Sequence, residues 1–334
     1  MRTIIGFCVA WLMLLSVGCG RATLVVGIGA GDQRLTETTV LKERGARGDT
    51  VALIDVSGML TSAEQRGLLS AESSAVSAFT EALNKAGKDE DVKAVVVRIN
   101  SPGGTVTASD IMYRELVRFR TTTGKPSVAV MMDLATSGGY YLACGADTII
   151  AHPTTVTGSV GVILQTVSLK PALSKIGVEA RAFTSGANKN AGSPFSELSD
   201  EQAETLQAMV DDFYERFVRV VRERRPELPE AHFAAATDGR VVTGRQALAW
   251  QMVDRLGDLR DGFREAKRLA KIEKADLVRY HRPLDAPGSI YAEAPVSPGQ
   301  GGSGVDIDVN LLRLDGALLS PSPGAYYLWT GDLP

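Results

Sequence analysis

The chain has 334 residues, of which 44% are hydrophobic and 22% charged, enough apolar material for one large folded core or two smaller ones. Its 36 Lys and Arg residues nearly balance its 39 Asp and Glu residues, which gives a net charge of −3. Because nothing in this balance indicates a basic surface, we expect no nucleic-acid partner.

The N-terminal segment, residues 1–18, is unlike the rest of the chain. Arg2 precedes an apolar run over residues 4–15, and the small residues 16–18 precede Cys19. This layout is typical of a secretory signal, and the run is short for a membrane span of about 20 residues. The stretch also resembles a bacterial lipobox, in which the cysteine is lipidated, although Ser16 stands where that pattern usually has Leu. We predict a lipidated Cys19, with an uncleaved anchor or ordinary secretion as alternatives, and a folded body outside the cytoplasm.

Cysteine usage limits cross-linking in the folded part of the chain. Cys8 lies within the N-terminal segment and Cys19 directly follows it, which leaves Cys144 alone in the body. A lone thiol cannot form an internal disulfide. We therefore interpret Cys144 as a small buried apolar residue.

Strand and helix patterns alternate through the first part of the body. Residues 92–99 are nearly continuous in β-branched side chains, as expected for a strand buried on both faces. The patterns predict strands over residues 51–56, 92–99, 127–132 and 148–151, and helices over residues 70–85 and 109–120. Such strand–turn–helix units indicate an α/β fold, with a parallel sheet and helices on its faces.

Helical patterns dominate after Ser199. Ser199 and Gln202 fit a capping box at the start of a long amphipathic helix, which Pro226 ends. Shorter helices are predicted over residues 243–250 and 259–270.

The chain divides by composition into five parts. After the N-terminal segment we predict a tether over residues 19–50, a folded domain over 51–282, a linker over 283–305 and a tail over 306–334. The linker is rich in Pro, Gly and Ser, and the tail regains apolar character. The tail is either a docking segment, which we favour slightly, or disordered.

Two glycine-containing turns follow predicted strands. The first holds Gly103 and Gly104 in the stretch NSPGG, and the second holds Ser137 and Gly138 in TSGG. Paired glycines leave backbone N–H groups uncovered, as an oxyanion hole requires, although glycine turns at strand ends are common. Ser137 is then either a nucleophile at a strand-to-helix turn or a helix cap.

A nucleophilic serine needs a base. The chain has three histidines, of which His152 follows the strand after Ser137 and stays open as a base, while His232 and His281 have no supporting context. A lysine is the other known activator, provided that burial keeps it uncharged. Lys189 lies among small residues in a predicted loop, where a lysine is usually solvated.

Five stretches in the same order resemble the signal peptide peptidase A family. They are RINSPGG from Arg98, TSGGYYLACGAD from Thr136, TGSVGVI from Thr157, SGANKNAGSPF from Ser185 and DGRVVTGRQAL from Asp238. Together they cover nearly all of the predicted folded domain. The resemblance implies a serine peptidase with a crotonase-like (Clp protease-like) fold of repeated ββα and βα units and a helical C-terminal portion.

The resemblance also implies roles for particular residues. It makes Ser137 the nucleophile, Lys189 its base in a Ser–Lys dyad, and Ser159 a residue that helps to hold the lysine. The stretch from Asp238 matches the family without a catalytic role that we can assign.

The oxyanion hole implied by the resemblance is formed by the amides of Gly103, Gly104 and Gly138. The mechanism needs no metal and no cofactor. The implied substrates are remnant signal peptides or other apolar peptides at a membrane. Family members with a single catalytic unit form rings with active sites at subunit contacts, so we expect a homo-oligomer.

Two other functions are compatible with this sequence pattern. A crotonase-like acyl-CoA enzyme would use the glycine turn to hold a thioester oxygen, but its substrate is cytoplasmic. A non-catalytic envelope scaffold would keep the fold, yet it would be free to lose Ser137 or Lys189. An unchanged turnover in Lys189→Ala would favour the acyl-CoA enzyme.

Overall fold

The computed structural model describes residues 35–63, 65–66, 71–282, 289–292 and 325–329. These residues belong to one compact unit, Leu35–Pro334. Cys19, the predicted signal and most of the predicted linker lie outside the described residues. Among the helices that are described, none is long and apolar enough to span a membrane.

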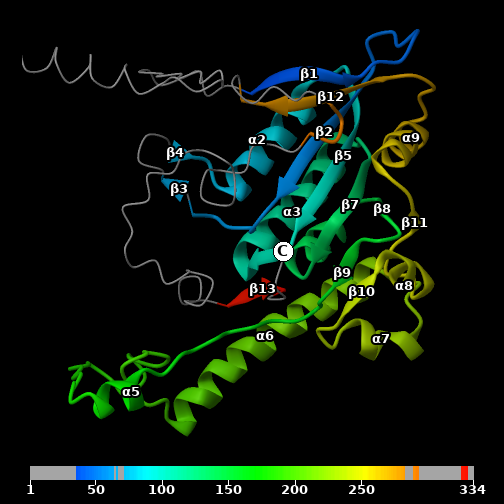
Figure 1. The fold of residues 1–334 in the computed structure, drawn as a ribbon. Helices are drawn as coiled ribbons and strands as arrows, with labels where there is room; N and C mark the ends of the chain where they lie inside the picture. Colours follow the sequence, from blue (N-terminus) through cyan, green and yellow to red (C-terminus); the bar gives the residue numbers. More distant parts are fainter. Residues whose placement is uncertain (1–34, 64, 67–70, 283–288, 293–324, 330–334) are drawn as a thin grey trace, which may run out of the picture. The chain divides into compact units, whose positions relative to one another are not determined.

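A mostly parallel sheet forms the centre of the unit, with the strand order β1-β12-β2-β5-β7-β8-β11 (Figure 1). Its strands are β1 (Thr36–Leu41), β2 (Thr50–Ser57), β5 (Val92–Ser101), β7 (Ser127–Thr136), β8 (Thr148–Ala151), β11 (Arg255–Leu256) and β12 (Asp276–His281). Neighbours from β12 to β11 are parallel, whereas β1 is antiparallel to β12. Part of residues 19–50, where we predicted a tether, thus forms an edge strand of the sheet. The α/β class and the parallel sheet predicted from the sequence are confirmed.

Helices cover both faces of this sheet. The helices α2 (Ala75–Lys88), α3 (Val106–Thr123) and α4 (Gly138–Ala143) pack on one face, and α9 (Leu259–Ala270) packs on the other. Strand β5 serves both faces, because Val97 and Ile99 belong to the first core and Val96 to the second. All three side chains are 0% exposed, as the run of β-branched residues predicted.

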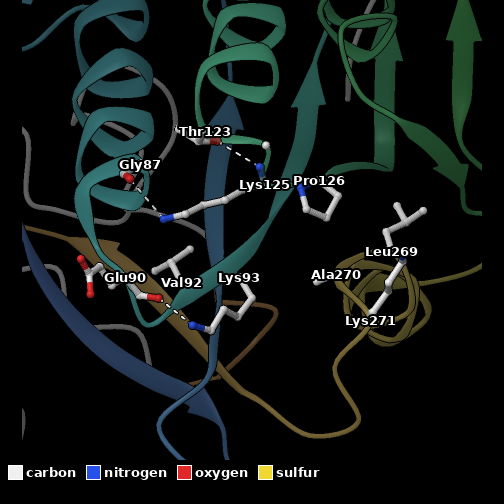
Figure 2. Close-up of a pocket in the computed structure, with 11 residues that line it drawn as sticks. Gly87, Glu90, Val92, Lys93, Thr123, Lys125, Pro126, Leu269, Ala270 and Lys271 are labelled. Atoms are coloured by element: carbon white, nitrogen blue, oxygen red, sulfur yellow. Dashed lines mark hydrogen bonds between the residues drawn. The ribbon is translucent and has the colours of Figure 1, made fainter.

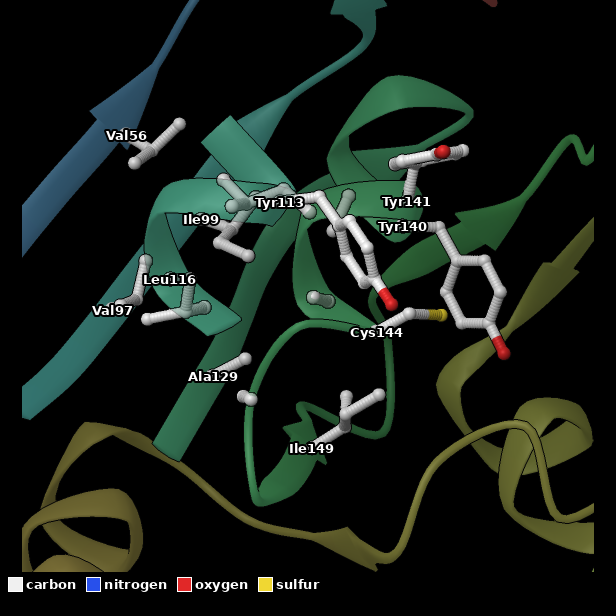
Figure 3. Close-up of a cluster of buried hydrophobic side chains, with 14 of the residues drawn as sticks. Val56, Val97, Ile99, Tyr113, Leu116, Ala129, Tyr140, Tyr141, Cys144 and Ile149 are labelled. Atoms are coloured by element: carbon white, nitrogen blue, oxygen red, sulfur yellow. The ribbon is translucent and has the colours of Figure 1, made fainter. Parts of the chain in front are cut away.

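The first core also contains Cys144. Figure 3 shows its thiol beside the ring of Tyr140, among aliphatic side chains from β5 and α3. Burial raises the pKa of the Cys144 thiol to about 11. Because the thiolate is the reactive form, Cys144 is an inert packing residue, as the sequence predicted.

An arm leaves the sheet after β9 (Val156–Gly158) and returns along helix α6 (Asp200–Arg224). The predicted capping box is present, with Ser199 and Gln202 in reciprocal contact. Near the C-terminal end of α6, Phe217, Val220 and Val221 are buried, whereas Met209 nearer the start is 43% exposed. The short helix α5 (Lys170–Lys175) lies in the same arm and has no buried residue.

The remaining elements are short. They are the helices α7 (Glu230–Ala236) and α8 (Gly244–Ala249), and the strands β3 (Gln65–Arg66), β4 (Ala71–Glu72), β6 (Gly103–Thr105), β10 (Val241–Thr243) and β13 (Tyr326–Leu328). Strand β9 joins the end of β7 and pairs with β10, and β13 pairs with β6.

Candidate active site

Ser137 lies at the turn between β7 and α4, at the carboxyl end of the parallel sheet. Its backbone dihedrals, φ 51° and ψ −114°, lie outside the regions that residues with side chains favour. The N–H of Ser137 donates to the Gly158 carbonyl at 2.7 Å, and its own carbonyl accepts from Tyr141 at 2.9 Å. Backbone contacts on both sides thus hold Ser137 in this conformation.

The Ser137 hydroxyl is buried and makes no hydrogen bond. The residue is 1% exposed, and its Oγ has no partner among the described residues. It does not cap α4, since no side-chain cap bond is present at that end. A buried hydroxyl without a partner is uncommon and fits a group kept for chemistry better than a helix cap.

Three glycines meet beside Ser137. A Cβ on Gly138 would lie 3.2 Å from the Gly103 Cα and 3.2 Å from the Gly104 amide nitrogen. A Cβ on Gly104 would lie 1.9 Å from the carbonyl oxygen of Leu60, which excludes any side chain there. The structure therefore brings together the three predicted oxyanion residues, with their backbones uncovered by side chains.

A peptide strand already lies along this turn. Strand β13 runs antiparallel to β6 with Tyr326 opposite Thr105, Tyr327 opposite Gly104 and Leu328 opposite Gly103. Its other edge bonds to Ile163, because Ile163 and Tyr326 exchange two backbone hydrogen bonds of 3.0 Å each. Figure 1 shows β13 in red between the end of the sheet and α6. An extended segment of the chain is thus held between two backbones, next to the three glycines.

Ser159 and Lys189 differ in their relation to Ser137. Ser159 is 7% exposed with φ 53°, and it follows Gly158, whose carbonyl holds the Ser137 N–H. Lys189 lies in the arm, with an exposed side chain, ten residues before the capping residue Ser199. Within the described chain, Ser137 and Ser159 are brought together, and no hydrogen bond joins Ser137 to Lys189.

His152, the other candidate base, contacts a neighbouring threonine. It follows β8 with an exposed side chain, and its Nδ1 lies 2.7 Å from the Thr154 hydroxyl. Since the Ser137 Oγ has no partner among the described residues, His152 is not bonded to it either.

A pocket of about 600 Å³ lies at the opposite ends of the strands, where β5 and β7 begin (Figure 2). Its rim carries Lys93 and Lys125, which point to the carbonyls of Glu90 and Gly87 at 2.8 Å and 3.1 Å. Both amines thus bond to backbone oxygens near the end of α2, a common use of lysine at a helix C-terminus. This pocket is separate from the site around Ser137.

Sequence reasoning missed two residues of the site. A Cβ on Gly138 would lie 2.3 Å from the Oγ of Ser109, a buried residue of α3 that closes one side of the glycine turn. Tyr141 lies one helical turn after Ser137, and its ring stacks on that of Tyr327 in β13. The spacing of four residues between Ser137 and Tyr141 could have indicated the second, whereas nothing local indicates Ser109.

Comparison with known proteins places the chain among peptidases. Residues 120–273 match the description "Peptidase family S49". A putative signal peptide peptidase SppA of Enterococcus faecium is 29% identical over 299 residues, covering 89% of this chain and 86% of the relative. The putative protease slr0021 of Synechocystis is 34% identical, covering 70% of this chain and 80% of the relative. Protease 4 of Salmonella typhi is 34% identical over 72% of this chain, which spans 38% of that longer protein.

Solved structures show weaker likeness. A membrane-bound stomatin-specific protease has a TM-score of 0.41 and 14% identity, covering 65% of this chain and 84% of that one. ClpP1 of Listeria monocytogenes has a TM-score of 0.41 and 15% identity, covering 63% of this chain and 93% of that one.

The sequence relatives match the assignment that the five motifs indicated, and the parallel sheet with its strand-to-helix turns fits the fold expected from them. The chain therefore belongs to peptidase family S49, the signal peptide peptidase A family, and is a serine peptidase with a Clp protease-like α/β fold.

Proposed function

We propose that the protein is an endopeptidase of the bacterial envelope that cleaves remnant signal peptides or other apolar peptides through Ser137 and Lys189. The observation that carries this proposal is the Ser137 hydroxyl, which is buried, without a partner among the described residues and next to three glycines. A nucleophile with uncovered backbone amides beside it is the arrangement that acyl transfer requires.

The proposed reaction uses these residues in turn. Uncharged Lys189 removes the proton of the Ser137 hydroxyl, whose oxygen attacks the carbonyl carbon of the peptide. The amides of Gly103, Gly104 and Gly138 surround the place where the negative oxygen develops. The protonated lysine then gives its proton to the leaving amine, and water, activated by the same lysine, releases the acyl group.

Lys189 has to come from a second copy of the chain in this proposal. Helix α6 is 25 residues long, or about 37 Å at 1.5 Å per residue. Lys189 precedes its N-terminal end, whereas Phe217 packs into the core near its other end. A base at the outer end of such an arm is well placed to reach a neighbouring subunit.

The surface of the arm supports a homo-oligomer. Its apolar side chains are exposed to an unusual degree, with Phe183 at 97%, Ile176 at 73% and Phe195 at 49%. Several large apolar side chains exposed on one segment are typical of an interaction site. An arm that docks on another copy would bury these side chains together with Lys189.

Hydrolysis of a fluorogenic apolar peptide by the chain that starts at Arg21 tests the dyad. We expect Ser137→Ala and Lys189→Ala each to lose nearly all activity while staying folded. Lys175→Ala is the matched control, because Lys175 is an exposed lysine of the same arm, and it should keep full activity. A Lys189→Ala variant that stays active would exclude Lys189 as the base and turn attention to His152.

Mixing the two inactive variants tests the origin of the base. If Lys189 acts in a neighbouring subunit, random co-assembly pairs an intact serine with an intact lysine at about a quarter of the contacts. Co-refolded Ser137→Ala and Lys189→Ala chains should then regain about that share of activity. A mixture that stays inactive, although both chains are shown in one oligomer, would place both residues of the dyad in the same subunit.

The location of the protein is part of the proposal. Relatives include a protein named signal peptide peptidase SppA, and the first residues of this chain have the layout of an export signal. Lipidation at Cys19 would tether the enzyme near its substrates. Labelled palmitate should enter the full-length protein but not its Cys19→Ser variant, and a signal in both would refute this site.

A further inference from the structure

The outer end of the arm contains one buried residue, Gln202, near the start of α6. Among residues 161–216, all of which the structure describes, Gln202 is the only buried one, and it is 6% exposed. Large apolar side chains of the same stretch, such as Phe183 and Phe195, are exposed. In this stretch, polar contacts rather than an apolar core therefore fix the local structure.

The oxygen of the Gln202 side chain completes the cap of α6. Its Oε1 accepts the backbone N–H of Ser199 at 3.2 Å, and the Gln202 backbone N–H donates to the Ser199 hydroxyl at 3.2 Å. These two bonds form the capping box. Either glutamine or glutamate completes such a box, because it needs only a side-chain oxygen. Capping therefore does not require the Nε2 group of Gln202.

The Nε2 group bonds instead to the loop that carries Lys189. It donates to the carbonyl of Ala187 at 2.6 Å and lies 3.3 Å from the Oδ1 of Asn190. Ala187 lies two residues before Lys189, and Asn190 directly follows it. The side-chain amide of Gln202 therefore holds the loop on both sides of the lysine.

Other polar bonds shape this loop from within. The amide of Lys189 donates to the Gly186 carbonyl at 3.2 Å, and the Nδ2 of Asn190 donates to the Ser196 hydroxyl at 3.0 Å. Both bonds join residues of the loop to each other. Among the described side chains of α6, only Gln202 bonds to the loop, so it provides the attachment to the helix.

The attachment affects where the lysine amine lies. A displacement of about 1 Å in a reacting group can lower a rate about 100-fold. Lys189 has a long, exposed side chain, so the position of its amine depends on how firmly its backbone is held.

We propose that Gln202 is a positioning residue for Lys189, because its side-chain amide ties the lysine loop to the start of α6 and thereby sets where the base lies. This inference rests on the proposed function, in which Lys189 is the base. Gln202 acts through the loop and not on the reacting atoms.

Gln202→Glu separates the amide from the cap. The carboxylate can still accept the Ser199 amide and complete the box, but it has no N–H to donate to Ala187. We expect peptide hydrolysis to fall about 10- to 100-fold, while the melting temperature stays close to that of the parent.

Gln246→Glu is the matched control. Gln246 completes the capping box of α8 through its Oε1, which accepts the Thr243 amide at 2.9 Å. Its side chain is exposed, and it lies outside the arm. The same substitution in the same motif should therefore keep full activity.

Mixed oligomers show whether Gln202 acts on the lysine or on folding alone. In the co-refolded pair described above, the Ser137→Ala chain supplies the lysine and the Lys189→Ala chain supplies the serine. Adding Gln202→Glu to the Ser137→Ala chain should lower the regained activity about 10- to 100-fold. Adding it to the Lys189→Ala chain should leave the regained activity nearly unchanged. Equal losses in the two mixtures, or no loss in either, would overturn the proposal.

Hydrogen exchange measures the loop without catalysis. The backbone amides of residues 187–191 should exchange at least about fivefold faster in Gln202→Glu than in the parent or in Gln246→Glu, because a local attachment is lost. Exchange in the strands β5 and β7 should not change. An unchanged exchange rate in the loop would also overturn the proposal.

These measurements separate failure of the positioning role from failure of the proposed function. If Lys189→Ala stays active, the proposed base is wrong, and the positioning role falls with it. If Lys189→Ala is inactive but Gln202→Glu keeps full activity, the positioning role is wrong and the base stands. If the mixed pair without Gln202→Glu stays inactive, the activities of Gln202→Glu and Gln246→Glu in the otherwise intact chain decide, together with hydrogen exchange.

Discussion

The glycine turn offers a sharp test of the site, through Gly103→Ala. Gly103 has φ 106°, and a Cβ there would lie 2.0 Å from the Tyr327 carbonyl oxygen and 2.8 Å from the Gly138 amide nitrogen. In the proposed mechanism this new methyl group would lie where the substrate carbonyl binds. The loss of oxyanion contacts should lower kcat about 100- to 1,000-fold, and the left-handed backbone should lower the free energy of unfolding by about 1–2 kcal/mol.

Gly124→Ala is the matched control. Gly124 ends α3 with φ 69°, and a Cβ there would meet nothing within 4 Å. The variant carries the same kind of backbone strain, about 1 kcal/mol, without a blocked carbonyl. Peptide hydrolysis and urea unfolding are measured for both variants. If Gly103→Ala keeps activity within a few-fold of Gly124→Ala, the turn is not where the substrate carbonyl binds.

Three further predictions concern polar groups in or beside the core. Cys144 should resist alkylation at pH 8 until the protein is unfolded in urea, because its thiol is buried and its pKa is raised to about 11; rapid labelling of the native protein would contradict this. Asp55 pairs with Arg98 at 2.6 Å and with Arg279 at 2.5 Å. Asp55→Leu should therefore lower the free energy of unfolding by about 3–5 kcal/mol, because two buried arginine charges lose their counter-charge. An unchanged free energy of unfolding in urea titrations would show that the arginines find other partners. Asp110 has a pKa below its ordinary value of 3.8, so its carboxylate stabilises the fold above pH 3.8, and that contribution is lost as the pH falls through the lowered pKa. The difference in the free energy of unfolding between the parent and Asp110→Asn should therefore shrink on acidification. A difference that grows would show that the charged carboxylate destabilises the fold.

The central strands could be predicted because each is a run of apolar residues within its own short segment. Residues 51–56, 92–99 and 127–132 fall inside β2, β5 and β7, and the capping box at Ser199 begins α6 as expected. The helix predicted from residue 70 begins instead at Ala75, because Ser74 caps it by accepting from the Ser77 amide at 3.2 Å.

Other elements depend on partners far away in the sequence. Strand β13 pairs Tyr326 with Thr105, and β1 pairs Thr36 with His281. Three-residue and edge strands carry little periodicity of their own, so nothing within residues 36–41 or 326–328 specifies the pairing.

The residues of the candidate site also differ in whether local sequence or distant contacts determine their positions. The turns that hold Ser137 and the three glycines could be predicted, because local residues specify each of them, whereas the catalytic roles of these residues stay predictions. The position of Lys189 relative to Ser137 could not be predicted, since Lys189 stands on an arm that has few contacts within the chain. The ring contact between Tyr141 and Phe217 escaped prediction because the two residues meet only when α4 packs near α6.

The backbone of Ser137 has a consequence for how this family can change over time. A residue with φ 51° and ψ −114° is held there against its own preference, by about 1–3 kcal/mol. A glycine at this position would relax the turn, so a Ser137→Gly chain should melt at a higher temperature than the parent. With Ser137 as the proposed nucleophile, loss of catalysis is then favoured by folding stability itself, and descendants that have become pure scaffolds are expected to carry glycine where this chain keeps its serine.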